Sequence, residues 1–167
     1  MNNAGKPNTH WSIWMVGVFS LIWHLMGCAN YLFQATMSPD TLAGLSAAQQ
    51  AVISDRPAWA TSAFAIAVFG GLLGSILLLL RKRLSLFLFL IALIGVIVSM
   101  IPLFGIVNSG VEFSTFERIM YLALTPLVGA FLLWFTRLAM RRGWVGDAPA
   151  NLALVAPGSS YHQHKNQ

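Results

Sequence analysis

The hydrophobic residues of the chain gather into four long runs separated by short polar links. These runs cover about residues 11–33, 58–80, 84–104 and 116–138. A helix of about 20 mostly apolar residues is long enough to cross the hydrocarbon core of a bilayer. The pattern therefore predicts an all-α integral membrane protein, a four-helix transmembrane bundle over residues 1–142. Residues 143–167 lose this pattern and are punctuated by glycine and proline, which predicts a flexible tail.

The composition supports the same class of protein. Of the 167 residues, 57% are hydrophobic and only 9% are charged, and the mean hydropathy is +0.70. A soluble domain carries about 25% charged residues. This chain has too few charges to cover a globule in water. Its only cysteine, Cys28, excludes a disulfide framework.

The basic residues are divided unevenly between the two ends of the predicted bundle. Most lie at one end: Lys6, Arg81, Lys82, Arg83, Arg137, Arg141, Arg142 and Lys165. The other end has only Arg56 and Arg118. Because Lys and Arg in short loops mark the cytoplasmic side, both termini and the tail are predicted to be cytoplasmic. Topology thus explains the net charge of +5, and a nucleic-acid partner is not expected.

The first span holds most of the polar residues that fall inside the runs. They are His24, Cys28, Asn30, Tyr31 and Gln34. Their spacing puts them on one helical face and an adjoining stripe, which predicts that they point into the bundle. One interpretation is a buried polar site, with His24 as a proton carrier and Asn30, Tyr31 and Gln34 as substrate contacts. The other, which we favour from the sequence, is hydrogen bonding between helices.

Metal and catalytic sites are not expected. His24 and Cys28 lie one helical turn apart, but no third ligand accompanies them. No second histidine falls within a span to complete a bis-histidine haem site in one chain, and His162 and His164 in the tail form an incomplete pair. The sequence also lacks a Ser-His-acid set within the spans, a pair of acidic residues inside the membrane and a glycine-rich phosphate-binding loop. We therefore predict no metal, no cofactor and no enzyme activity.

Two further motifs concern packing and loops. The second span carries small residues along one face, which predicts a helix-packing interface within the bundle or between subunits: Ala63, Ala67, Gly70 and Gly74. In the link before it, Ser46 and Gln49 have the spacing of a capping box. This predicts a short helix over residues 47–53. Pro102 and Pro126 predict interruptions of the backbone hydrogen bonding in the third and fourth spans.

The segment Trp23–Tyr31 resembles a family of small four-span bacterial membrane proteins. The resemblance continues at Pro57–Ala60, through Ala65–Ser75 and to Leu80–Arg83, and it is weaker in the fourth span. It implies a bacterial inner-membrane location; members have no assigned activity and are sometimes loosely labelled sugar transporters. Members often have Asn at the position of His24 and Asp at the position of Asn30. This chain lacks that acid, so the resemblance does not carry a proton-coupled role onto it.

The sequence therefore favours a small multi-pass inner-membrane protein with an interaction, regulatory or structural role. The alternative is an oligomeric small-solute transporter with a polar site on the first span. Expected partners are membrane lipid and either a second copy of this chain or another membrane protein.

Overall fold

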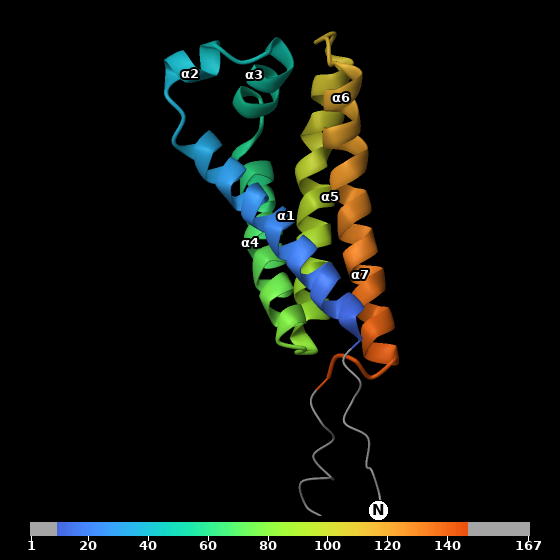
Figure 1. Ribbon diagram of the computed structural model, residues 1–167. Helices are drawn as coiled ribbons and strands as arrows, with labels where there is room; N and C mark the ends of the chain where they lie inside the picture. Colours follow the sequence, from blue (N-terminus) through green and yellow to red (C-terminus); the bar gives the residue numbers. More distant parts are fainter. Residues whose placement is uncertain (1–9, 147–167) are drawn as a thin grey trace, which may run out of the picture.

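The computed structural model describes residues 10–146, and this range contains helices and turns but no strand (Figure 1). Four helical segments are long and apolar enough to cross a membrane: α1 (Trp11–Ala35), α4 (Ala58–Leu79), α5 (Leu84–Asn108) and Thr115–Arg141. The fourth consists of α6 (Thr115–Arg118), the π-helix η1 (Ile119–Leu124) and α7 (Thr125–Arg141). The predicted all-α fold with four spans is confirmed.

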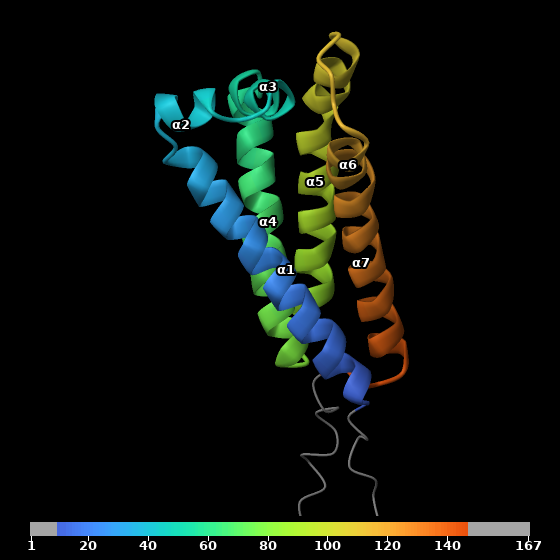
Figure 2. The ribbon, with the colours of Figure 1, turned by 45° about the horizontal axis from the view of Figure 1, so that its top comes forward.

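The long helices are arranged so that one of them crosses the others. In both ribbon views α4, α5 and α7 run side by side, while α1 crosses them obliquely (Figures 1 and 2). α1 starts beside the last turn of α7 and then diverges from α7 along its length. We call the bundle end that holds the α4–α5 link the basic end. The opposite end carries α2 (Pro39–Ala43) and α3 (Ala47–Ser54), and we call it the α3 end.

The bounds of the third span differ from those predicted. α5 continues through Pro102 and Gly105 and ends at Asn108. A Cβ at Gly105 would meet no atom of residues 10–146 within 4 Å, so Gly105 does not interrupt the helix. The helix ends instead just before Gly110, whose φ of +90° is open to glycine at little cost. Apolar length alone therefore underestimated this helix.

The basic end is closed by residues that follow α7. The backbone N–H of Gly146 donates to the carbonyl oxygen of Arg81 at 3.0 Å. The ring of Trp144 stacks on His10, with ring centres 4.5 Å apart. The first residues of the predicted tail over residues 143–167 thus pack on the bundle, because an aromatic ring and a backbone hydrogen bond anchor them. The rest of that tail lies outside the described residues.

The small residues of the second span face α5. A Cβ at Gly95 of α5 would lie 2.8 Å from the carbonyl oxygen of Ala63, and one at Gly74 would lie 3.1 Å from Phe89. Such close approach requires small side chains on both helices. The helix-packing residues therefore meet α5 of the same chain: Ala63, Ala67, Gly70 and Gly74.

The loops at the α3 end are fixed by two capping boxes. The predicted box of Ser46 and Gln49 is present and starts α3, which confirms the short helix. A second box, formed by Ser114 and Glu117, starts α6. The Ser46 hydroxyl also donates to the Glu117 carboxylate at 2.9 Å, joining the two loops.

Two hydrophobic cores hold the bundle, one near each end. Near the basic end, Leu78, Leu132 and Ala139 are completely buried. At the α3 end, Val52 of α3 packs with Phe113.

Candidate functional site: a cavity between the helices

A cavity of about 440 Å³ lies between the two cores. Its wall is drawn from α1, α4, α5, η1 and α7. Protein interiors seldom contain voids larger than a water molecule, whereas small-molecule sites enclose about 300–1,000 Å³. Met26 and Asn30 of α1 line the cavity and are exposed, so it reaches the surface of the bundle. Its volume falls within the range of small-molecule sites.

A hydrogen-bonded cluster of Ser20, His24 and Ser75 joins α1 to α4 beside the cavity. The hydroxyls of Ser20 and Ser75 lie 2.6 Å apart, and both side chains are fully buried. Nδ1 of His24 lies 2.8 Å from the carbonyl oxygen of Ser20 and 3.2 Å from the Ser75 hydroxyl. Polar groups this deep in hydrocarbon are stable only when paired, and the cluster pairs them across two helices.

The contacts also assign the protons of this cluster. The Ser75 hydroxyl donates to the carbonyl oxygen of Gly71 at 2.7 Å, so it accepts from Ser20. A carbonyl oxygen can only accept, so Nδ1 of His24 carries the proton that bonds to Ser20. Nε2 is then an acceptor, and no donor in the part of the chain described here bonds to it.

Gly71 leaves the space that the imidazole occupies. A Cβ at this position would overlap Cδ2 and Nε2 of the His24 ring. Gly70, one residue earlier, would place a Cβ no closer than 4.0 Å to the Leu88 carbonyl oxygen. The close approach of α1 to α4 therefore depends on Gly71 rather than on Gly70.

Toward the α3 end, the cavity wall carries two amides from α1. Asn30 and Gln34 lie one turn apart on the stripe that also includes Gly27. Relative to His24 they are displaced by about 9 Å and about 15 Å along the helix axis. Neither amide has a hydrogen-bond partner among residues 10–146. The polarity of the cavity thus increases from His24 toward this end.

Arg56 enters the cavity from the link between α3 and α4. Its guanidinium carbon lies 5.1 Å from the centre of the Phe64 ring, a cation–π contact. No carboxylate of the described chain forms an ion pair with it. Burial lowers the pKa of the guanidinium, an effect that nearby Tyr121 partly opposes. Because arginine stays protonated in proteins, Arg56 remains a half-buried positive charge without a counter-ion among residues 10–146.

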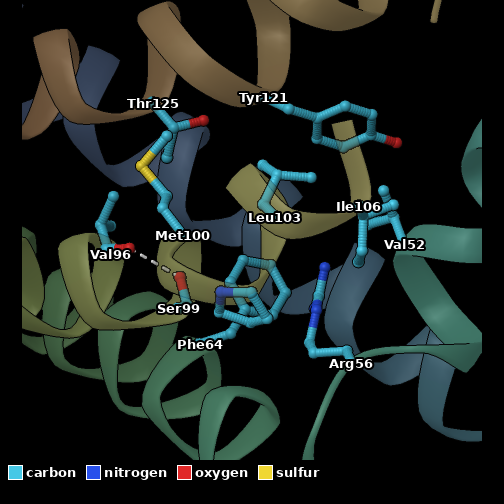
Figure 3. Close-up of a pocket in the computed structure, with 11 residues that line it drawn as sticks. Val52, Arg56, Phe64, Val96, Ser99, Met100, Leu103, Ile106, Tyr121 and Thr125 are labelled. Carbon is cyan, nitrogen blue, oxygen red and sulfur yellow. Dashed lines mark hydrogen bonds between the residues drawn. The ribbon is translucent and has the colours of Figure 1, made fainter. Parts of the chain in front are cut away.

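A smaller pocket of about 60 Å³ adjoins the cavity and shares part of its wall. Figure 3 shows Arg56 reaching into it beside Phe64, with the Tyr121 ring on the opposite side. Ser99 satisfies its hydroxyl within α5 by donating to the Val96 carbonyl oxygen at 2.8 Å. Val96 lines both the pocket and the cavity, so it forms part of the boundary between them.

The π-helix η1 shapes the remaining wall. Pro126 has no N–H to continue the helical hydrogen bonding, and the hydroxyl of Thr125 donates to the carbonyl oxygen of Met120 at 3.2 Å. The wider turn places Met120 and Tyr121 on the cavity wall. Pro126 thus brings a π-turn to the wall, and π-turns are frequent at functional sites.

The five polar residues predicted on the first span do not form one site. His24, Asn30 and Gln34 line the cavity. Cys28 is buried outside its wall, and Tyr31 packs against the rings of Phe64 and Phe69 of α4. Of the predicted polar residues, the cavity wall therefore includes His24 and the stripe of Asn30 and Gln34, but not Cys28 or Tyr31.

Sequence reasoning missed three contributors: Ser75, Arg56 and Tyr121. Ser75 stands one turn after Gly71, and a serine after a glycine in an apolar span was a usable signal. From the sequence, Arg56 was only one of the two basic residues at the sparsely charged end, and nothing in its neighbourhood reveals that it turns inward. In the described residues, no three His, Cys, Asp or Glu side chains gather in a way that could hold a metal ion. The chemistry offered by the cavity is hydrogen bonding, positive charge and apolar contact.

The chain was also compared with known proteins. It matches no protein-family model, no curated protein and no solved structure. The case for function therefore rests on the cavity, and the resemblance to a four-span bacterial family stays a prediction.

Proposed function

We propose that this multi-pass membrane protein binds a small amphipathic molecule in the cavity and serves as its membrane carrier or receptor. The observation that carries the proposal is the cavity of about 440 Å³ between two packed cores. Among residues 10–146, the lining amides of Asn30 and Gln34 lack hydrogen-bond partners and Arg56 lacks a counter-ion, although unpaired polar groups are costly where water is excluded. A ligand would supply those partners.

This proposal develops the solute-transport alternative rather than the interaction role. The interaction role depended on a surface of small residues, and that surface, with Gly74 and Ala63, packs against α5 of the same chain. A homo-oligomer or a protein partner remains a proposal without a specific surface. The cavity, by contrast, provides a defined place for a ligand.

The proposed location is a bacterial inner membrane with the basic end in the cytoplasm. The cluster of Arg81–Arg83 supports this orientation through the positive-inside rule. The polar part of the cavity would then face the outer leaflet. A fluorescent-protein fusion after Gln167 should fluoresce, because that reporter matures in the cytoplasm; an exported, dark fusion would contradict the orientation.

Native mass spectrometry of the detergent-released protein tests ligand binding. Val96 lines the cavity, whereas Ile97, the next residue of α5, is 54% exposed on the outside of the bundle. We expect the wild-type protein and Ile97→Phe to retain a defined small molecule, and Val96→Phe to lose it with unchanged helicity and elution. Equal retention of ordinary lipids by all three proteins would refute the proposal.

A further inference from the structure

The charge of Arg56 gives information about the ligand beyond its size. A charge removed from water is stable when a counter-ion and hydrogen bonds accompany it. Arg56 has a ring contact with Phe64, but no acidic side chain of the described chain pairs with it. The nearby acid Glu117 accepts from Ser46 and from its own helix start instead. The cavity therefore presents a positive charge whose partner must come from outside this part of the chain.

The remaining lining is divided along the cavity. Arg56, Asn30 and Gln34 all line the part of the cavity toward the α3 end, where the unpartnered amides offer N–H donors. Further toward the basic end the wall is mostly apolar and includes Phe89 and Leu132 of the adjoining core, with the imidazole of His24 as its polar group. A molecule that matches both regions has an anionic head and a hydrocarbon tail.

We propose that the ligand is a long-chain acid whose carboxylate pairs with Arg56 and whose single hydrocarbon chain lies along Phe89 and Leu132. This inference rests on the proposed function of the cavity and names the substrate class. A guanidinium binds a carboxylate through two parallel hydrogen bonds, and the amides of Asn30 and Gln34 add donors to the same head. Entry is through the surface opening lined by Met26 and Asn30.

Displacement of a dansyl-labelled long-chain fatty acid from the purified full chain in nonionic detergent tests this inference. Oleate and oleyl alcohol are the competitors, because they share a chain and differ in the charged head. We expect oleate to compete at least about tenfold better than the alcohol, since a hydrogen bond to a charged group contributes roughly a factor of ten or more. Oleoyl lysophosphatidic acid is added as a third competitor to separate a carboxylate from a phosphate head, and competition at least equal to that of oleate would overturn the carboxylate assignment.

Two pairs of variants distinguish the possible results. Arg56→Gln should weaken competition by oleate about tenfold and leave competition by oleyl alcohol unchanged. Arg118 is an exposed cation at the same end, and Arg118→Gln should change neither. Val96→Phe should weaken competition by both oleate and oleyl alcohol, and Ile97→Phe should weaken competition by neither. If oleyl alcohol competes as well as oleate and Arg56→Gln changes neither competition, the assignment of a long-chain acid is wrong but the proposed ligand-binding function of the cavity stands. If Val96→Phe is silent, the cavity function fails as well.

Discussion

The guanidinium carbon of Arg56 lies 5.1 Å from the centre of the Phe64 ring. This contact holds a positive charge against an aromatic face at the border of the cavity, where α3 meets α4. A cation over an aromatic ring gains about 0.5–1 kcal/mol at exposed sites and more when it is desolvated. Phe64 therefore orients Arg56 without neutralising it, and the charge remains available to an anionic ligand.

A double-mutant cycle on this pair measures that contact. Arg56→Gln removes the charge, and Phe64→Leu removes the aromatic face while keeping an apolar side chain. We expect a coupling free energy of about 0.5–2 kcal/mol in the unfolding of the ligand-free protein. Additive effects of the two substitutions would show that the ring does not hold the guanidinium.

Gly71 and Gly70 should respond differently to alanine. Gly71→Ala inserts a methyl group into the His24 ring, and overpacking of this kind costs about 1–3 kcal/mol. Gly70→Ala meets only the Leu88 carbonyl oxygen at 4.0 Å and should be neutral or slightly stabilising, because alanine favours helix by up to ~1 kcal/mol. Thermal unfolding in one detergent compares the two variants. Adding His24→Ala to Gly71→Ala should recover part of the loss; no recovery would contradict the overlap.

Ser75 should contribute more to stability than Ser62 of the same helix. Each hydroxyl donates to a carbonyl oxygen one turn earlier, but only Ser75 also bonds to Ser20 and His24 of α1. Hydrogen bonds between membrane helices average about 0.6 kcal/mol and reach ~1.7 kcal/mol. We expect a loss in this range for Ser75→Ala and a smaller effect for Ser62→Ala. Additive losses for Ser20→Ala and Ser75→Ala would exclude the link between helices.

The bond from Ser46 to Glu117 should couple the two loops at the α3 end. Ser46→Ala removes both the cap of α3 and this bond, and loss of a cap costs about 1 kcal/mol. We expect faster amide hydrogen exchange in α3 and also in Ser114–Arg118. Ser38→Ala removes the cap of α2, which has no bond to α6, and should affect α2 alone. An unchanged α6 in Ser46→Ala would contradict the coupling.

The fold was predictable from local sequence, while the cavity was only partly so. Four apolar runs and the Ser46 capping box depend on residues within a few turns of one another, and each was identified from its spacing. The inward course of Arg56 depends on how α3, α4 and η1 meet, which no local pattern encodes. Likewise Ala63 and Gly74 mark a close helix contact, but the sequence does not say that the partner is α5 rather than a second subunit.

Site-specific photolabelling tests most directly whether a small amphipathic molecule occupies the cavity. Palmitic acid and palmityl alcohol, each with a diazirine midway along the chain, would be crosslinked to the purified protein and mapped by peptide mass spectrometry. α5 provides the internal comparison, because Leu93 and Val96 line the cavity while Ile94 and Ile97 are exposed on the outside. We expect the acid to label Leu93, Val96 and Met120 of η1, with the label reduced by excess oleate. Equal labelling of Ile94 and Ile97 by both probes, insensitive to oleate, would contradict a ligand in the cavity.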